Sequence, residues 1–439
     1  MGKLQLKSGS ASTRARRRST MAVPGVAVLL AAICGPVAAG ASPRPTLASS
    51  MVPPAKPGNI TEQDYYTAGD NTEMVAFIKQ FQKQDPGYTV TRDVFPSGSA
   101  ASQTLTEASA HQLPDLLMMD NPVMPELAAS GDLVPLKSLG VNTSGLTEGA
   151  IAAGSYKGVQ YGIGFGNNTI GLFYNKKLLS AAHVTPPATW AQLVTDAKIL
   201  TKNGVAGFEV AADNVPGSAV WQFLPFFWTA GGDLEHVNNA GGVKALTLYA
   251  ELAKEGALPT SVVDEQQNNT AVDFMAGKAA MIIMGPWEFE PFNATKGLSY
   301  GIAPVPVPSP GESAAAPLGG EVWVVPKSSP ANEALGVKLL EFLTSPQSTY
   351  SWASQNGEIA SQKSVSAALL AKVPQDKIFA EEIEHARSRT GEVGLAYSAI
   401  ETALGTAVQA VILGRQTPTQ ALDTAEVAVK AALAQYHVG

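Results

Sequence analysis

A short apolar run that ends abruptly constrains this chain more than any other feature. The run spans residues 279–284, and the pair Gly285-Pro286 follows at once, before Trp287 and Glu288. Its length predicts a buried strand, and a Gly-Pro pair cannot continue a central strand. The sequence therefore predicts an aromatic face and a carboxylate together at the end of a rigid strand. This pairing suits a sugar, which stacks its C–H face on indole and donates its hydroxyls to carboxylate oxygens. A tryptophan packed in the core is the alternative.

The N-terminal residues have the layout of an export signal. A basic cluster at residues 14–18 precedes an apolar run from Met21 to about Ala39, and small residues continue to Ala41. This order predicts a secretory signal peptide over residues 1–41. A retained membrane anchor is the alternative, although Pro and Gly residues interrupt the run. We expect no later membrane span, because no later run reaches the roughly 18–20 apolar residues that a spanning helix needs.

The rest of the chain is acidic and has ample apolar residues for a core. Of 439 residues, 45% are hydrophobic and only 15% are charged, which predicts folded lobes or domains and excludes a disordered polyelectrolyte. Residues 1–41 hold six basic residues and no acidic one, so removing them takes the formal net charge from −7 to −13. An acidic body binds nucleic acid poorly. We therefore expect no nucleic-acid partner.

Cysteine and proline usage define the segments around the predicted cleavage site. The single cysteine, Cys34, lies inside the predicted signal peptide, so the folded body holds no disulfide and no cysteine-containing zinc site. Residues 42–58 contain five prolines and few apolar residues. This composition predicts an extended, disordered tether.

Strands and helices are predicted to alternate from residue 59. Strands are expected over residues 59–67, 88–95 and 114–120, with helices between them. Asp70 with Glu73 three residues later predicts a capping box at the start of the first helix. This rhythm is typical of an α/β fold.

Several segments of the chain resemble extracellular solute-binding proteins of the carbohydrate ABC-transporter family. The segments are Gly277–Glu288, Leu113–Asp120, Pro125–Leu136, Leu172–Leu178 and Gly319–Lys327, and they occur in the family's order. The resemblance extends over about residues 59–438. It implies a periplasmic-binding-protein type II fold, with two α/β lobes joined by a multi-crossing hinge and the ligand cleft between them.

The resemblance also implies how the chain is divided. The first lobe is expected at residues 59–165 with a return segment at 317–358. The second lobe is expected at residues 166–316 and 359–439, the latter including the C-terminal helices. Family members are often lipoproteins, so a lipid anchor at Cys34 is an alternative to cleavage after Ala41. The residue before the cysteine, Ile33, is larger than the small residue that such signals prefer.

Candidate ligand-binding residues follow from aromatic, carboxylate, amide and arginine side chains at predicted strand ends and at the hinge. In the family, the tryptophan after Gly-Pro lines the cleft, and an arginine lies near it. The candidate ligand-binding residues are Tyr65, Tyr66, Ser97, Asp120, Asn121, Asn167, Asn168, Trp221, Trp228, Trp287, Glu288, Gly320, Glu321, Arg387 and Arg389.

Some of these residues have open alternatives. Each of the two tyrosines is either a stacking platform or a core residue, and the hinge asparagines either bond hydroxyls or cap a turn. Trp221 and Trp228 lie seven apart on one helix face, which suits core packing as well as a ligand wall. Which of the two arginines points inward is open.

The predicted function is a substrate-binding receptor of an ABC importer. Two lobes would close around a sugar or short oligosaccharide and deliver it to the membrane permease subunits. We expect an exported, extracytoplasmic monomer without cofactor or metal. The chain has no HExxH, GxSxG or Walker motif, so we expect no enzyme. The alternatives are a receptor of the same fold for a polyamine or an anion, and a secreted glycan-binding protein or glycosidase, whose paired carboxylates sequence cannot exclude.

Overall fold

A five-stranded sheet organises the first part of the chain in the computed structural model, which describes residues 54–66, 68–371, 377–383 and 386–436. The predicted signal peptide, including Cys34, lies outside these residues. The sheet has the strand order β2-β1-β3-β11-β6. Its strands are β1 (Asn59–Asp64), β2 (Thr89–Val94), β3 (Leu116–Asp120), β6 (Gly162–Gly164) and β11 (Glu321–Val324).

The first three strands are parallel, and the returning strand β11 is antiparallel to both of its neighbours. The carboxyl ends of β1, β2 and β3 therefore meet at one edge of the sheet. The register pairs Glu321, at the start of β11, with Asp120, at the end of β3. The same edge thus receives side chains from two distant parts of the sequence.

Both faces of this sheet are buried, which explains the continuous apolar runs of its strands. Leu116 and Met118 pack on one face with Trp323, and Leu117 and Met119 pack on the other. Successive side chains of β3 thus point to opposite faces of the sheet and pack into two apolar layers.

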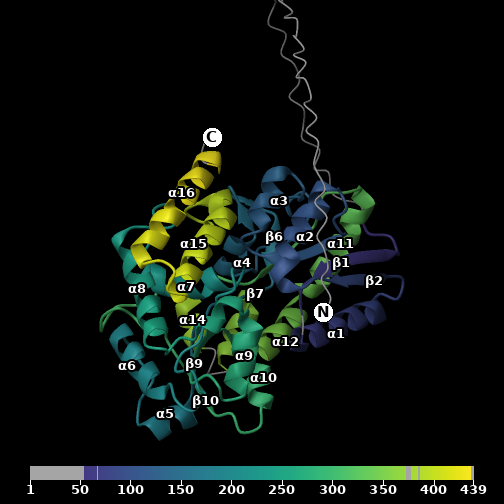
Figure 1. Cartoon of the computed structure of the whole chain (residues 1–439). Coiled ribbons are helices and arrows are strands. Elements are labelled where there is room, and N and C mark those ends of the chain that lie inside the picture. Colours follow the sequence, from purple (N-terminus) through teal and green to yellow (C-terminus); the bar gives the residue numbers. More distant parts are fainter. Residues whose placement is uncertain (1–53, 67, 372–376, 384–385, 437–439) are drawn as a thin grey trace, which may run out of the picture. The chain divides into compact units, whose positions relative to one another are not determined.

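Helices cover both faces of the sheet and form with it the first lobe (Figure 1). They are α1 (Ala68–Gln84), α2 (Ser97–Ser109), α3 (Met124–Ser130), α4 (Glu148–Ala153), α11 (Pro330–Leu343), α12 (Pro346–Asn356) and α13 (Lys363–Leu370). The predicted cap at Asp70 is wrong, because α1 begins at Ala68 and Asp70 lies in its first turn.

A three-stranded antiparallel sheet, with the order β10-β8-β9, forms the centre of the second lobe. Its strands are β8 (Gly171–Asn175), β9 (Met281–Met284) and β10 (Tyr300–Ala303). The predicted apolar strand before Gly285-Pro286 is confirmed as β9, and all four of its residues are buried. Bridges from Ala206 and Glu209 run parallel to β9 and extend this sheet on its far side.

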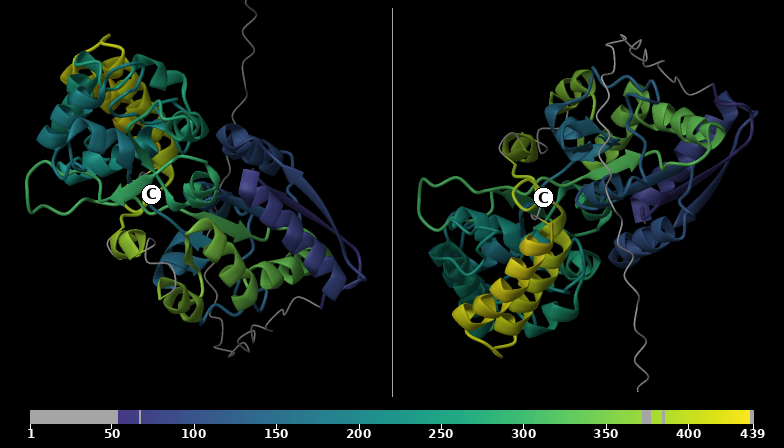
Figure 2. Two further views of the ribbon diagram at one scale, coloured as in Figure 1. Left: turned by 90° about the horizontal axis from the view of Figure 1, so that it is seen from below. Right: turned by 90° about the horizontal axis from the view of Figure 1, so that it is seen from above.

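Nine helices surround this sheet among the described residues. They are α5 (Lys176–Ala182), α6 (Trp190–Leu200), α7 (Ala219–Thr229), α8 (Ala240–Lys254), α9 (Gln267–Met275), α10 (Phe289–Ala294), α14 (Lys377–Ile383), α15 (Tyr397–Ile412) and α16 (Pro418–Tyr436). In Figure 2, the yellow helices α15 and α16 lie beside the teal helices of the second lobe, and α15 and α16 contact α8. At the start of α6, Thr189 and Gln192 form a complete capping box.

One helical segment corrects the expectation that no later run could span a membrane. Residues Gly394–Ile412, which include α15, are long and apolar enough by length and composition. However, Ile400, Leu404 and Val408 are fully buried in the core of the second lobe. The apolar face of this helix is therefore explained by packing within a folded lobe.

The chain passes repeatedly between the two sheets. It runs from β6 to β8, and from β10 back to β11. Two two-stranded sheets complete the fold, β7 (Gly166–Asn167) with β12 (Ile359–Ala360) and β4 (Ser155–Tyr156) with β5 (Val159–Gln160). The β7–β12 pair lies at the first crossing, so the hinge is tied by strands from distant parts of the sequence.

The predicted domain boundaries differ from the packing at two points. Residue 359 was expected to open the second lobe, but α13 shares an apolar cluster with α12 through Val365, Leu369 and Ala353. The tether was expected to extend to residue 58, but the Ala55 carbonyl accepts from the Tyr88 hydroxyl at 2.7 Å. The folded body therefore includes residues upstream of 59.

Candidate functional site

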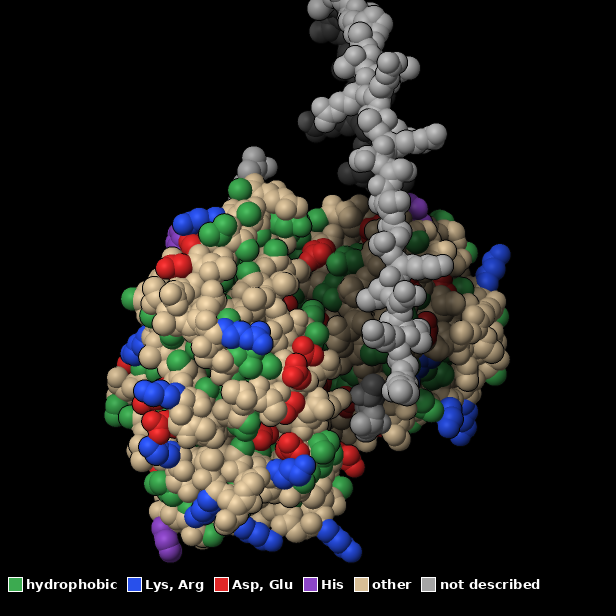
Figure 3. All heavy atoms as spheres, viewed as in Figure 1, with side chains coloured by type: hydrophobic (Ala, Val, Ile, Leu, Met, Phe, Trp, Pro, Cys, Tyr) green, Lys and Arg blue, Asp and Glu red, His purple; other side chains and the backbone are tan. Residues whose placement is uncertain are grey.

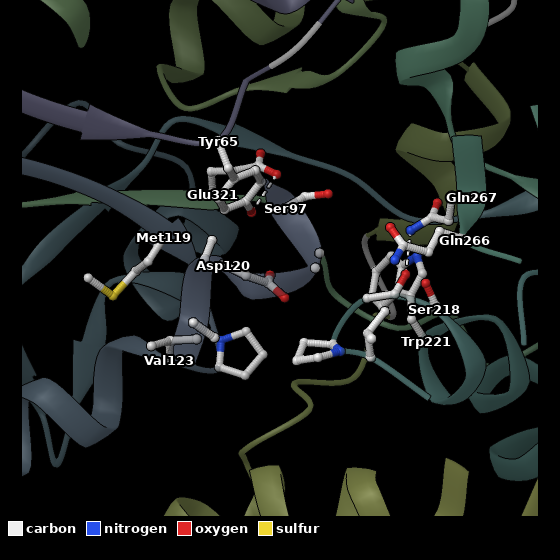
Figure 4. Close-up of a pocket in the computed structure, with 18 of the residues that line it drawn as sticks. Tyr65, Ser97, Met119, Asp120, Val123, Ser218, Trp221, Gln266, Gln267 and Glu321 are labelled. Carbon is white, nitrogen blue, oxygen red and sulfur yellow. Dashed lines mark hydrogen bonds between the residues drawn. The ribbon is translucent and has the colours of Figure 1, made fainter. Parts of the chain in front are cut away.

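A cavity of about 400 Å³ lies where the edge of the first sheet meets elements of the second lobe (Figure 4). Ten of the fifteen predicted residues line it: Tyr65, Tyr66, Ser97, Asp120, Asn168, Trp221, Trp287, Gly320, Glu321 and Arg389. Five do not: Asn121, Asn167, Trp228, Glu288 and Arg387. The cavity falls at the carboxyl ends of parallel strands, where α/β sheets commonly bind ligands.

The two tyrosines after β1 have different environments. Tyr66 is 4% exposed and packs in the core of the first lobe, with its ring centroid 4.5 Å from that of Trp352. Tyr65 is only partly buried, and its hydroxyl donates to Oε1 of Glu321 at 3.2 Å (Figure 4). Tyr65 is therefore the better-placed stacking surface of the two.

Glu321 faces the cavity from the start of β11. Its Oε1 accepts from Tyr65, whereas its Oε2 is buried without a hydrogen-bond partner. Burial, reinforced by the nearby carboxylates of Glu358 and Asp120, raises the pKa of Glu321 well above its ordinary value. A hydroxyl or ammonium group of a ligand could donate a hydrogen bond to Oε2 and so give this buried acceptor a partner.

Asp120 and Arg389 form a bidentate pair in the cavity wall. Nη1 of Arg389 donates to Oδ2 of Asp120 at 2.8 Å, and Nη2 donates to Oδ1 at 2.5 Å. The arginine side chain is 2% exposed and the aspartate 26% exposed. Burial alone lowers the pKa of Arg389, but the Asp120 carboxylate outweighs it and raises the pKa above its ordinary value. The pair fixes one carboxylate orientation toward the cavity.

Asn121 supports this pair without lining the cavity. Its Oδ1 accepts from Nη2 of Arg389 at 3.3 Å, and its Nδ2 donates to the Gly320 carbonyl at 3.2 Å. Gly320 has φ +114°, and an added Cβ would lie 2.0 Å from the Gly166 carbonyl oxygen. Only glycine fits this position of the hinge.

Helix α7 contributes one of its two predicted tryptophans to the cavity. Trp221 lines it, and the Arg389 guanidinium lies 4.6 Å from its ring centroid. An added Cβ on Gly319 would lie 2.5 Å from Cη2 of Trp221, so glycine lets the ring lie against the hinge backbone. Trp228 lies outside the cavity, where Arg387 stacks on it at 4.7 Å. Arg389 is thus the arginine that faces inward.

The side chains of Trp287 and Glu288 point in different directions after the Gly-Pro pair. Residues Pro286–Glu288 form a 3-10 turn, in which successive side chains point in different directions. Trp287 lines the cavity, with its ring over Gly285, where an added Cβ would lie 2.0 Å from Cζ3. Glu288 is buried away from the cavity, and burial raises its pKa to about 7. Other carboxylates therefore accompany the indole.

The hinge asparagines also divide between the cavity and the hinge. Asn168 lines the cavity and donates from Nδ2 to Oε1 of Glu358 at 2.9 Å. Oε2 of Glu358 accepts from Nε1 of Trp352 at 2.6 Å. Asn167 is buried in β7 and donates to Oγ1 of Thr147 at 3.3 Å.

Several lining residues were not predicted from the sequence. They include Asp70, Ser218, Gln266, Gln267, Glu358 and Glu401. Three of them had a usable signal, since Glu401 interrupts an apolar helix face and Gln266-Gln267 begin a run of amides at the start of a helix. Gln266 and Gln267 face the cavity opposite Asp120 and Glu321 in Figure 4.

The cavity is strongly acidic. Its charged residues, among those described, are Asp70, Asp120, Glu321, Glu358 and Glu401, with Arg389 as the one cation. Burial is the largest cause that raises the pKa of Asp70 to about 8 and that of Glu401 to about 7. Acidic side chains also run along the middle of the face seen in Figure 3. Such a site favours hydrogen-bond donors and cations and disfavours anions.

The carboxylates that line this cavity do not form a group with metal-ligand spacing among the described residues. No histidine or cysteine lines it among the described residues. The group of carboxylates with metal-ligand spacing in the described part of the chain comprises Glu209, Glu265 and Asp273, and none of these lines the cavity.

Comparison with known proteins places the chain in a family. The family model of bacterial extracellular solute-binding proteins matches residues 76–381, which is more than half of the chain. A galactooligosaccharide-binding protein of Bacillus subtilis (strain 168) is 26% identical over 289 residues, which cover 64% of this chain and 67% of that protein.

Solved structures share the fold over nearly their whole length. An ABC transporter solute-binding protein from Thermotoga lettingae TMO, bound with alpha-D-tagatose, has a TM-score of 0.78 and 26% identity and covers 85% of this chain and 99% of its own. The GacH receptor of Streptomyces glaucescens GLA.O, solved unliganded and with acarbose, has a TM-score of 0.75 and 25% identity and covers 86% and 99%. The predicted two-lobe α/β fold is confirmed.

Proposed function

This chain belongs to the family of bacterial extracellular solute-binding proteins, and we propose that it captures a sugar or short oligosaccharide for an ABC importer. Relatives named for galactooligosaccharide and maltooligosaccharide binding support this proposal. No covalent step is required of the residues in the cavity. Their task is to bind one solute and release it to a permease.

The observation that carries the proposal is the combination of aromatic rings and hydrogen-bond acceptors in one cavity. The partly exposed rings of Tyr65 and Trp287 can stack on sugar C–H faces, and Trp221 adds a more deeply buried ring to the cavity wall. The carboxylates of Asp120 and Glu321 can accept from hydroxyls. The volume of about 400 Å³ lies in the range of small-molecule sites, roughly 300–1,000 Å³.

Hinge closure is the mechanism that the strand connections support. The cavity is lined by both lobes, so a ligand that contacts both sides stabilises the closed arrangement relative to the open one. The crossings between β6 and β8 and between β10 and β11 are the segments that would absorb the rotation. We further propose that the closed form docks on permease subunits, and that the protein is an exported monomer, cleaved after Ala41 or lipid-anchored through Cys34.

A cationic solute, such as a polyamine, is the second candidate ligand. The acidic lining favours it, because five carboxyl groups face a single arginine. That arginine is already paired with Asp120, and Oε2 of Glu321 has no hydrogen-bond partner, so this oxygen is available to an ammonium group. The partly exposed rings of Tyr65 and Trp287 favour the sugar, since stacking on C–H faces does not require charge.

Thermal unfolding against a ligand panel tests the proposal. The panel contains tagatose, maltooligosaccharides and galactooligosaccharides, with spermidine and sulfate as the non-sugar arms. A solute that binds only the folded protein stabilises it by about 2.7 kcal/mol at a hundredfold excess over its dissociation constant. We expect a rise in midpoint with one sugar or a few related sugars.

Two variants locate the site. Trp287→Ala should abolish the rise, because the indole lines the cavity. Tyr436→Ala, which removes an aromatic ring that is 46% exposed at the end of α16, should retain it. A rise with spermidine alone would replace the sugar by the cationic ligand, and no rise with any solute would overturn both.

A further inference from the structure

Three carboxylates of the second lobe converge outside the ligand cavity. Glu209 comes from the segment that runs parallel to β9, Glu265 follows the 3-10 turn Thr260–Asp264, and Asp273 lies on α9. One carboxylate oxygen from each residue lies within 4.8 Å of the others. These residues belong to three different segments, so the fold itself brings them together.

The cluster contains buried oxygens that no protein group satisfies. Glu209 is 5% exposed, and its Oε2 is buried without a hydrogen-bond partner. Oε2 of Glu265 is likewise buried without a partner. Buried carboxylate oxygens without donors are costly, so a native structure normally supplies a partner such as a cation.

A lysine at the cluster compensates its charge only in part. Nζ of Lys278 lies 3.0 Å from Oδ1 of Asp273. The lysine side chain is 63% exposed, so its ammonium can return to water if a metal ion takes its place.

We propose that Glu209, Glu265 and Asp273 bind a calcium ion. Ca²⁺ prefers oxygen ligands at 2.3–2.6 Å, so two oxygens on one ion can lie up to about 4.8 Å apart. The observed spacing meets this limit without movement of the side chains. Mg²⁺ keeps several waters and usually takes only one or two protein carboxylates, so a site with three carboxylates suits Ca²⁺ better. Asp273 is 28% exposed, which leaves room for water among the remaining ligands.

The proposed ion would also brace one wall of the ligand cavity. Gln266 and Gln267 line that cavity and directly follow Glu265. Gln267 opens α9, the helix that carries Asp273. Nε2 of Gln266 donates to Oδ2 of Asp213 at 3.1 Å, which already links this loop to the start of the α7 region. An ion that ties Glu265 and Asp273 to Glu209 would therefore restrict the loop and raise ligand affinity, a consequence that depends on the proposed function.

Calcium binding is tested directly by calorimetry and thermal unfolding of the protein after EDTA treatment. About 1 mM free Ca²⁺ covers the dissociation constants of 10⁻⁴–10⁻³ M found in extracellular modules. We expect saturable binding of one ion, a raised unfolding midpoint, and a smaller effect of Mg²⁺ at the same concentration.

The variants Glu209→Gln and Glu255→Gln form a matched pair. Glu209→Gln should lose both the binding heat and the shift, yet remain folded in EDTA, because the amide has nearly the same shape as the carboxyl group and removes one of three clustered acids. Glu255→Gln removes a carboxylate of the same lobe that pairs with Lys198 on the surface, and it should keep the calcium response. Absence of calcium binding by the unaltered protein, or an equal response in Glu209→Gln, would overturn the site.

The ligand-binding arm separates this inference from the proposed function. Sugar binding that strengthens on addition of Ca²⁺ supports both the site and its coupling to the cavity wall. Calcium binding without any change in sugar affinity retains the site and removes the coupling. Sugar binding without calcium binding retains the proposed function and removes the site.

Discussion

Two tryptophan–arginine stacks lie side by side in sequence but differ in what surrounds them. Trp221 with Arg389 and Trp228 with Arg387 have almost the same ring-to-guanidinium distance, 4.6 and 4.7 Å. The inner stack, Trp221 with Arg389, lines the cavity. Nη1 and Nη2 of its arginine both donate to Asp120 of the first lobe. The outer arginine pairs with the local, exposed Glu392. The two stacks thus share a stacking distance and differ in the carboxylate that pairs with the guanidinium group, Asp120 or Glu392.

Removal of the inner arginine should have the largest effect on stability. Arg389→Ala leaves Asp120 in the cavity wall without its cation, and we expect a loss of about 3 kcal/mol in the free energy of unfolding. Arg387→Ala breaks a pair whose side chains are 36% and 40% exposed, so the loss should stay below about 1 kcal/mol. Urea unfolding of both variants measures the difference.

One experimental outcome would contradict the distinction between the two stacks. Equal losses for the two arginine variants would mean that Asp120 contributes nothing beyond stacking. The inner stack would then differ from the outer one only in position.

The two tryptophans should separate in ligand affinity. Trp221→Leu removes a ring from the cavity wall, and we expect the binding free energy to weaken by about 2 kcal/mol, which is roughly thirtyfold in Kd. Trp228→Leu should lower stability by a comparable core-packing cost while it leaves Kd within about twofold. Titration with the ligand found in the thermal panel provides the measurement, and similar Kd values for both variants would contradict the inner-versus-outer distinction.

The acids around the inner stack predict a smaller, pH-dependent effect. Burial raises the pKa of Glu401 to about 7, above the value of about 4.3 in an unfolded chain. The folded protein therefore binds more protons, and stability should fall as pH rises from about 5 to 8, by on the order of 1–2 kcal/mol for this group. Glu401→Gln should flatten the decline, as followed by urea unfolding at each pH. An unchanged slope would show that Glu401 does not titrate in this window.

Much of the fold could be predicted because its strands obey simple rules. The buried strand before Gly285-Pro286 and the capping box at Thr189 depend on local chemistry, and both are found. The predicted start of α1 was wrong. Aspartate is a residue type that commonly caps helices, but this helix begins at Ala68, before Asp70. Neighbouring residues decide such a boundary, and one acidic side chain does not fix it.

The site was less predictable because its members depend on direction and on distant partners. Trp287 and Glu288 are adjacent in a 3-10 turn, but Trp287 lines the cavity and Glu288 is buried outside it. Trp221 and Trp228 share a helix face, and periodicity cannot say which end of that face reaches the cavity. Glu358 was missed because its role depends on Asn168 and Trp352, which meet it only in the folded hinge.

Calorimetric titration of the unaltered protein with the sugar panel and with spermidine tests the central claim most directly. The proposed receptor should bind one sugar per molecule in a saturable manner, with binding that spermidine does not displace. Binding of spermidine alone, or no binding of any sugar at millimolar concentration, would contradict the assignment of this acidic, aromatic cavity to a carbohydrate.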